Sequence, residues 1–154
     1  MSDPKSFSDN GVNLASTDMK EIEKHYQTLL THHINRAKLP KVYGWTSQVM
    51  MSLIWRLGKT PLEISLIADE LEVPTRTLQN HLSTEGTNFS NLRDQIRRHY
   101  AIRLLIDDNK KVEDIWPILD FKDRTGLINA FKRWTGLPPA HFKKLYNVYL
   151  KDKP

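Results

Sequence analysis

The chain has 154 residues, enough for one ordinary domain or two small ones. Its 39% hydrophobic and 27% charged residues are typical of a globular protein, and the absence of cysteine excludes disulfides, thiolate zinc sites and cysteine nucleophiles. A net charge of +5 and a pI of about 9.4 favour an anionic partner, with nucleic acid ahead of an anionic membrane surface.

Residues 1–17 are rich in Ser, Asp, Asn and Gly and lack apolar periodicity, which predicts a disordered arm. This segment has no apolar core of a secretion signal, and no run in the chain approaches 18 apolar residues. We therefore expect a cytoplasmic protein that does not span a membrane.

Residues 18–44 are predicted to form an N-terminal helix and a loop. Asp18 and Glu21 have the spacing of a capping box, and Leu39-Pro40 ends the helix. Tyr43-Gly44 is interpreted as the loop. The helical apolar stripe consists of Ile22, Tyr26, Leu29, Leu30, Ile34 and Ala37.

Residues 45–87 contain a first helix-turn-helix pattern. A helix that starts at Thr46 or Ser47 is followed by PLEISLIADELEVPTRTLQNHL, which predicts two short helices separated at Val73-Pro74. The second of these helices points Leu78 and Leu82 inward. Its exposed polar residues are Thr75, Arg76, Gln79 and Asn80.

Residues 88–106 form a long predicted linker helix with Asn88 as its cap. At 1.5 Å per residue it spans roughly 27–30 Å, close to the spacing of about 34 Å between successive major grooves on one face of B-DNA. Such a rod could place two recognition helices one helical turn apart within a single chain. Its predicted apolar stripe is Phe89, Leu92, Ile96, Tyr100 and Leu104.

Residues 107–150 contain a second helix-turn-helix pattern. A short helix from Val112 ends before Asp120-Phe121, and a second helix over residues 123–134 is followed by Gly136, a position that favours a left-handed residue, and by the stop Pro138-Pro139. No further helix is assigned after these prolines.

The apolar residues of the two units repeat. The first helix and turn match at a constant offset of 48 residues, and the second helix matches at 49, so one residue is added before the second recognition helix. The matched pairs are Ile67/Ile115, Leu71/Leu119 and Val73/Phe121 at 48, and Leu78/Leu127 and Leu82/Phe131 at 49. The predicted fold is all-α, with seven or eight helices: two helix-turn-helix units, a linker helix and an N-terminal helical extension.

The segment from Leu62 to Lys144 resembles the DNA-binding domain of the AraC/XylS family. The matching residues are IADELEVPTRTLQNHLSTEGTNFSNL and NAFKRWTGLPPAHFKK. The resemblance implies a sequence-specific, DNA-binding transcription regulator on the bacterial nucleoid, with double-stranded DNA as its partner and RNA polymerase as a candidate second partner. Residues 18–40 are too few for the upstream domain of many members, so the chain is either a short stand-alone member or the C-terminal part of a longer regulator.

The family pattern assigns base reading to both recognition helices, and Arg, Gln, Asn and Thr suit base edges in the major groove. The base-reading candidates are Thr75, Arg76, Gln79 and Asn80 in the first unit and Arg124, Thr125, Ile128 and Asn129 in the second. The phosphate-contact candidates are Arg93, Arg97, Lys110, Lys111, Lys132, Lys143 and Lys144.

The tight turns depart from the family pattern, which usually has a small or left-handed-tolerant residue there. Glu72 and Asp120 occupy these positions, at a cost of about 1 kcal/mol each if left-handed. Both carboxylates are expected near phosphates if the turns lie close to DNA.

The second unit departs further. Pro117 fits its short helix only if that helix starts near Glu113 or Asp114. Gly126 should weaken the recognition helix by about 1 kcal/mol relative to Ala. We therefore expect the first unit to read bases and the second to read DNA loosely or to act on its backbone.

One alternative keeps the fold without DNA reading: a non-catalytic protein-interaction module, either an anti-activator or an adaptor that dimerises through the helix over residues 18–39. No Ser-His-Asp order, phosphate-binding Gly loop or carboxylate pair predicts an enzyme. His25, His32 and His33 have no Asp, Glu or Cys set nearby that would complete a metal site. No cofactor is expected.

Overall fold

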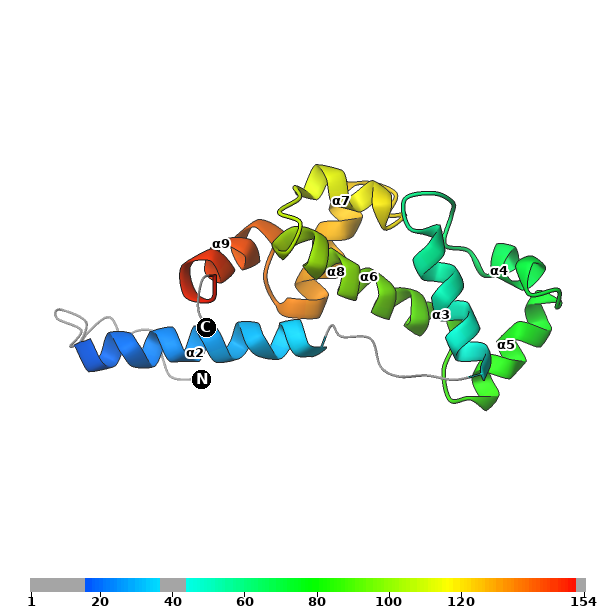
Figure 1. Cartoon of the computed structure of the whole chain (residues 1–154), viewed down its shortest axis with the longest axis horizontal. Coiled ribbons are helices and arrows are strands. Elements are labelled where there is room, and N and C mark those ends of the chain that lie inside the picture. The colour runs from blue at the N-terminus through cyan, green and yellow to red at the C-terminus, as the bar shows by residue number, and fades with distance from the viewer. Residues whose placement is uncertain (1–15, 37–43, 152–154) are drawn as a thin grey trace.

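The computed structural model describes residues 16–36 and 44–151, and all regular structure in these ranges is helical (Figure 1). This confirms the predicted all-α class. The helices are α2 (Ser16–Arg36), α3 (Gly44–Arg56), α4 (Ile64–Glu70), α5 (Thr75–Thr84), α6 (Phe89–Ile106), α7 (Val112–Ile118), α8 (Arg124–Thr135) and α9 (Pro139–Tyr149).

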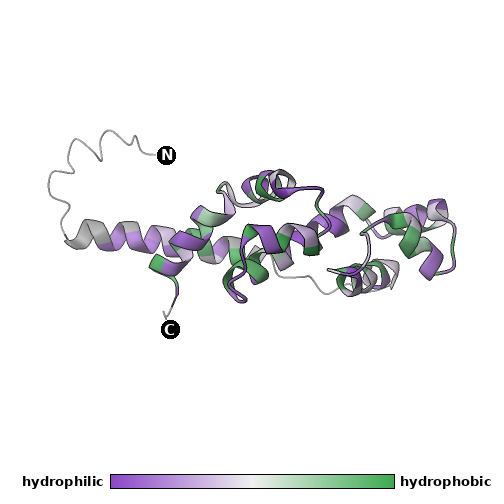
Figure 2. Ribbon diagram, turned by 90° about the horizontal axis from the view of Figure 1, so that it is seen from above, coloured by the Kyte–Doolittle hydropathy of each residue, from purple (hydrophilic) through white to green (hydrophobic). Residues whose placement is uncertain are grey.

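The helices form two groups joined by α6. Helices α3, α4 and α5 lie at one end of the molecule, α7, α8 and α9 lie at the other, and α2 runs beside the second group (Figure 1). In Figure 2 apolar and polar residues alternate around the helices, as expected when each helix has a buried and a solvent-facing side. We call the two groups the first unit and the second unit.

Each unit has its own hydrophobic core, and α6 contributes to both. The first core consists of Val49, Met50, Leu53, Leu62, Ile67, Ala68, Leu78, Leu82, Leu92 and Ile96. The second core consists of Leu30, Ala101, Ile102, Leu105, Ile115, Leu119, Leu127, Phe131 and Phe142.

Helix α6 turns different faces toward the two cores. Leu92 in its first half and Ala101 in its second half are nine residues apart, about two and a half turns, and so lie on opposite sides of the helix. The single predicted stripe through Tyr100 and Leu104 was therefore wrong in the second half, where these two side chains are only half-buried. A helix that spans two units has no single apolar face.

The predicted repeat is confirmed by the backbone hydrogen bonds of the two turns. Leu71 N donates to Ile67 O (2.9 Å), as Leu119 N donates to Ile115 O (3.2 Å). Three further pairs share the offset of 48 residues: Val73 N to Ala68 O (3.0 Å) and Phe121 N to Trp116 O (3.0 Å), and Glu72 and Asp120, which both have φ of 59°. Helix α5 begins at Thr75 and α8 at Arg124, which places the added residue between turn and recognition helix.

Pro117 lies inside α7, although the helix begins at Val112 rather than at the predicted Glu113 or Asp114. The proline is tolerated because it occupies the last turn, where it removes only one helical N–H. Leu119 N resumes the pattern by donating to Ile115 O.

Several predicted boundaries were wrong. Ser16 and Thr17 belong to α2 rather than to a disordered arm, so Asp18 lies inside the helix and does not cap it. Residues 1–15 and 37–43, including the predicted end at Leu39-Pro40, lie outside the described residues. Gly44 begins α3 instead of belonging to a loop, and α9 follows the Pro138-Pro139 stop. Pro139 is the first residue of α9, where a missing N–H costs nothing.

Glu85, at the end of α5, caps the start of α3. Its carboxylate accepts hydrogen bonds from Trp45 N (3.0 Å), Thr46 N (2.8 Å) and Thr46 Oγ1 (2.6 Å). Gly44 makes this approach possible, because a Cβ at that position would lie 2.7 Å from Glu85 Oε2 and its φ of +67° disfavours other residues. The cap ties the first and last helices of the first unit together.

Acidification is expected to weaken this cap. Hydrogen bonds from the Thr46 side chain, the Thr46 backbone and the Trp45 backbone lower the pKa of Glu85 below its ordinary value of 4.5. A carboxylate with a lowered pKa stabilises the fold above pH 4.5, and this stabilisation is lost as pH falls through the lowered pKa. Urea unfolding of the wild type and Glu85→Gln should show a stability difference at pH 7 that shrinks in acid. A difference independent of pH would contradict the expectation.

Helix α2 packs against the second unit. Leu30 is 1% exposed, the Tyr26 ring stacks on Tyr149 at 5.1 Å, and Gln27 Nε2 donates to Tyr149 O (2.8 Å). The apolar stripe proposed for a homodimer is thus covered by α9 of the same chain over these residues. Within the described ranges, no helix is both long and apolar enough to span a membrane.

Candidate nucleic-acid interface

Helix α5 presents its polar residues to solvent. Pro74 precedes it in an extended conformation, and Leu78 and Leu82 anchor its inner face at 0% exposure. Arg76, Gln79 and Asn80 are exposed and Thr75 is half-buried. Within the described part of the chain no ion pair involves Arg76, so its guanidinium is available to a ligand.

Helix α8 presents an equivalent face. Asp123 caps the helix by accepting a hydrogen bond from Gly126 N (2.8 Å). The Arg124 guanidinium pairs with Glu113 of α7 at 3.0 Å, with both side chains about 60% exposed. Exposed pairs of this kind are worth only about 0–1 kcal/mol, so Arg124 can exchange this partner for another anion. The other candidates in this helix are Thr125 and Asn129, which are exposed, and Ile128, which is half-buried.

Replacing Gly126 by alanine is expected to stabilise the second unit by up to about 1 kcal/mol, because Gly126 is helical and alanine has the higher helix propensity. The new Cβ would lie 3.4 Å from Phe121 Cδ1, an ordinary contact. Urea unfolding measures the change. Gly136→Ala is the control of opposite sign, since Gly136 ends α8 with φ of 82°. A lower stability of Gly126→Ala would contradict the expectation.

A polar cavity of about 330 Å³ lies between the units, beside the first half of α6. Its walls are Ser90, Asn91, Arg93, Asp94, Arg97 and Arg133. A neighbouring cavity of about 510 Å³ shares Ser90 and Asn91 and reaches Gln79 of α5. The cavity therefore lies next to the reading face of α5, and three arginines against one carboxylate suit an anion.

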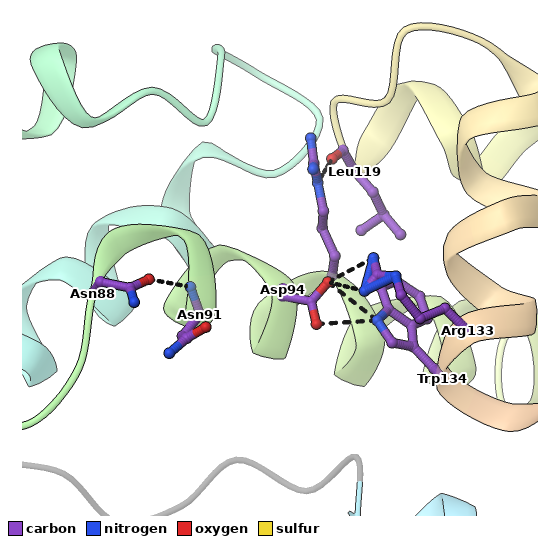
Figure 3. A network of polar contacts seen from close by, with 7 residues as sticks. Asn88, Asn91, Asp94, Leu119, Arg133 and Trp134 are labelled. Carbon is purple, nitrogen blue, oxygen red and sulfur yellow. Dashed lines mark hydrogen bonds and ion pairs between the residues drawn. The ribbon is translucent and has the colours of Figure 1, made fainter.

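Asp94 fixes α8 on α6. Its Oδ1 accepts hydrogen bonds from the Arg133 guanidinium (3.1 and 3.3 Å), and both of its carboxylate oxygens lie 3.1 Å from Trp134 Nε1 (Figure 3). In the same view Asn88 caps α6 by accepting from Asn91 N (2.9 Å), as predicted. Arg133 was missed because only its neighbour Lys132 was considered for phosphate contact, although its position in NAFKRW marked it as a basic candidate.

Arg97 does not lie where the prediction of a phosphate contact requires it. Its Nε donates to Leu119 O (2.8 Å), one Nη donates to Asp120 O (2.5 Å), and the guanidinium lies 4.3 Å from the centre of the Phe121 ring. Burial lowers the pKa of Arg97 to about 10, with repulsion from Arg93 as the second cause, so it stays protonated at neutral pH. Arg97 bridges α6 to the turn of the second unit, and Arg93 also donates to a backbone carbonyl, Leu62 O (3.3 Å).

The Asp120 carboxylate also differs from its predicted place near phosphate, because its Oδ2 accepts a hydrogen bond from Leu62 N (2.9 Å). The lysines proposed for phosphate contact lie before α7 and on α8 and α9. Lys111, Lys132 and Lys144 are exposed, and Lys110 and Lys143 are half-buried. Their role stays a prediction.

The histidines of α2 gain no metal-binding neighbours from the fold. His25 and His32 are exposed, and the side chain of His33 lies outside those described. In the part of the chain that the structure describes, no three His, Asp or Glu side chains come close enough to hold a metal ion.

A protein-family model described as "Helix-turn-helix domain" matches residues 67–145, just over half of the chain. The chain is 30% identical over 101 residues to the ornithine utilization regulator of Pseudomonas aeruginosa, covering 66% of this chain and 30% of that protein. It is 31% identical over 131 residues to the HTH-type transcriptional regulator VirS of Mycobacterium tuberculosis, covering 84% and 38%. It thus spans about a third of the length of these relatives.

Among solved structures, the transcriptional regulator CdpR of Pseudomonas aeruginosa is similar, with a TM-score of 0.59 and 30% identity over 66% of this chain and 32% of that one. The printed names are those of transcriptional regulators rather than enzymes. With two matching turns, two exposed recognition helices and one joining helix, the chain belongs to the AraC-type helix-turn-helix family of transcriptional regulators.

Proposed function

We propose that this chain is a sequence-specific DNA-binding transcription regulator that places α5 and α8 in successive major grooves on one face of the duplex. The observation that carries the proposal is the pairing of two equivalent helix-turn-helix units on one helix. Helix α6 has 18 residues, or about 27 Å, against the groove spacing of about 34 Å. A single chain could therefore read an asymmetric site.

The charges of the interface support DNA over the protein-interaction alternative. Three of the carboxylates that could interrupt a basic face are engaged within the protein: Asp94 with Arg133, Glu113 with Arg124, and Asp120 with Leu62 N. The cavity lined by three arginines would receive a backbone phosphate between the two recognition helices. Family membership and the names of the relatives favour the same function.

Base reading is assigned to Thr75, Arg76, Gln79 and Asn80 of α5 and, with less of the total affinity, to Arg124, Thr125, Ile128 and Asn129 of α8. RNA polymerase is the proposed partner of the DNA-bound protein, which would act on the nucleoid in the cytoplasm. A homodimer through α2 would need a face of that helix other than the one that carries Leu30, because that face is covered.

Selection of bound sites from a random pool of double-stranded DNA, at fixed salt, tests the proposal. The expected result is one enriched sequence with two conserved blocks about one helical turn apart, bound far more tightly than scrambled DNA. Equal affinity for selected and scrambled DNA would refute sequence-specific binding and leave the interaction-module alternative.

A further inference from the structure

A set of contacts holds the second unit's turn against the first unit; we call it the inter-unit clamp. It consists of Arg97, Asp120 and the backbone of residues 58–62. Gly58 N donates to Ile118 O (2.9 Å), and Leu62 N donates to Asp120 Oδ2 (2.9 Å). Arg97 of α6 closes the clamp through its hydrogen bonds to Leu119 O and Asp120 O. Segments about 60 residues apart in sequence are thus joined directly.

The clamp explains an unfavourable residue. Asp120 has φ of 59°, where glycine would be unstrained, and so does Glu72 at the equivalent position of the first unit. The two carboxylates differ in what they contact. That of Asp120 reaches across to Leu62 N, whereas that of Glu72 is exposed and makes no contact with the other unit in the described part of the chain. Asp120 keeps its strained backbone together with an inter-unit hydrogen bond.

We infer that the inter-unit clamp fixes the separation of α5 and α8, so that Arg97 and Asp120 are positioning residues for the spacing of the DNA site. The inference rests on the proposed function. Without the clamp the two units share only α6 and its side contacts, and small rotations about that helix would move one recognition helix relative to the other. One added base pair displaces a half-site by about 3.4 Å and about a tenth of a turn, a change that a rigid protein cannot follow.

The internal repeat supplies matched variants. Asp120→Gly removes the carboxylate and relieves the backbone, and Glu72→Gly makes the same change at the equivalent position without touching the clamp. Arg97→Lys keeps the charge that DNA would attract but cannot reproduce the two hydrogen bonds of the guanidinium fork. The double variant Arg97→Lys/Asp120→Gly removes most of the clamp.

Affinity is measured for the selected site and for copies with one base pair inserted or deleted between its two blocks. The wild type and Glu72→Gly should each lose on the order of tenfold, the scale of a mismatched base pair. The double variant should lose about threefold or less, and each single variant should fall between. Identical spacing profiles for all four proteins would overturn the inference.

A second measurement is independent of DNA. The sequence has no cysteine, so spin labels attach only at Ser83→Cys in the first unit and Ala140→Cys in the second, both exposed positions. The distance distribution between the labels should be narrow in the wild type and in Glu72→Gly and broad in the double variant. An equally narrow distribution in the double variant would overturn the clamp. If wild-type binding shows no sequence preference, the proposed function fails, and the distance distribution still decides whether the clamp exists.

Discussion

Replacing Arg76 by alanine is expected to lower the affinity for the selected DNA site by about 5- to 150-fold, because a bidentate contact to guanine is worth about 1–3 kcal/mol. Arg76 is exposed on α5 and no ion pair in the described residues holds it, so the whole guanidinium is available. Affinity for scrambled DNA should fall much less. Fluorescence anisotropy with both duplexes at one salt concentration measures the two losses.

Lys144→Ala is the matched control, because Lys144 is an exposed cation on α9 outside both recognition helices. A phosphate contact adds affinity for any sequence, so this variant should bind both duplexes more weakly by the same factor. The slope of log K against log salt should also become shallower by about 0.9. If Arg76→Ala weakened both duplexes equally, Arg76 would contact the backbone and base reading by α5 would need other residues.

Replacing Phe131 by alanine is expected to have the largest effect on stability. Phe131 is 1% exposed and packs edge-to-face on Phe142, with ring centroids 5.4 Å apart. Large-to-small changes at such sites cost about 3–5 kcal/mol, a large part of the 5–15 kcal/mol of a typical domain. Since the two units have separate cores, the second unit should lose its structure at lower urea than the first.

The equivalent first-unit position, Leu82, provides the control. Leu82→Ala should cost about 2–5 kcal/mol and unfold the first unit before the second. Two-dimensional amide NMR spectra across a urea series resolve signals from the two units. A single shared transition for both variants would show that α6 and the inter-unit clamp couple the units into one cooperative structure.

Two further results would bear on the second unit's reading of DNA. The family pattern is strongest in NAFKRWTGLPPAHFKK, yet α8 and the helix after it are tied to the rest of the fold by Asp94 and Phe142. The exposed residues near the start of α8 remain free to read bases, except that Arg124 must leave Glu113. Weak conservation of the block under α8 in the selected site would fit this arrangement.

The sequence alone predicted the elements and the duplication. Helical spacing of apolar residues located the helices of both units, and the repeat at 48 and 49 residues predicted equivalent turns and an added residue before α8. These predictions succeeded because a short helix, its turn and its apolar contacts are set by residues close together in the chain. They failed where a partner far along the chain decides the structure, as at the start of α3, where Glu85 lies about 40 residues away.

The tertiary structure decided the roles of the charged residues. Arg97 and Asp120 suggested phosphate contact and phosphate repulsion in the sequence, but in the fold they join the two units. A charged side chain at a helix surface has the same local pattern whether it faces solvent, DNA or another part of the protein. The sequence therefore determined that two recognition helices exist, and only the packing of α6 against two separate cores determined how far apart they are held.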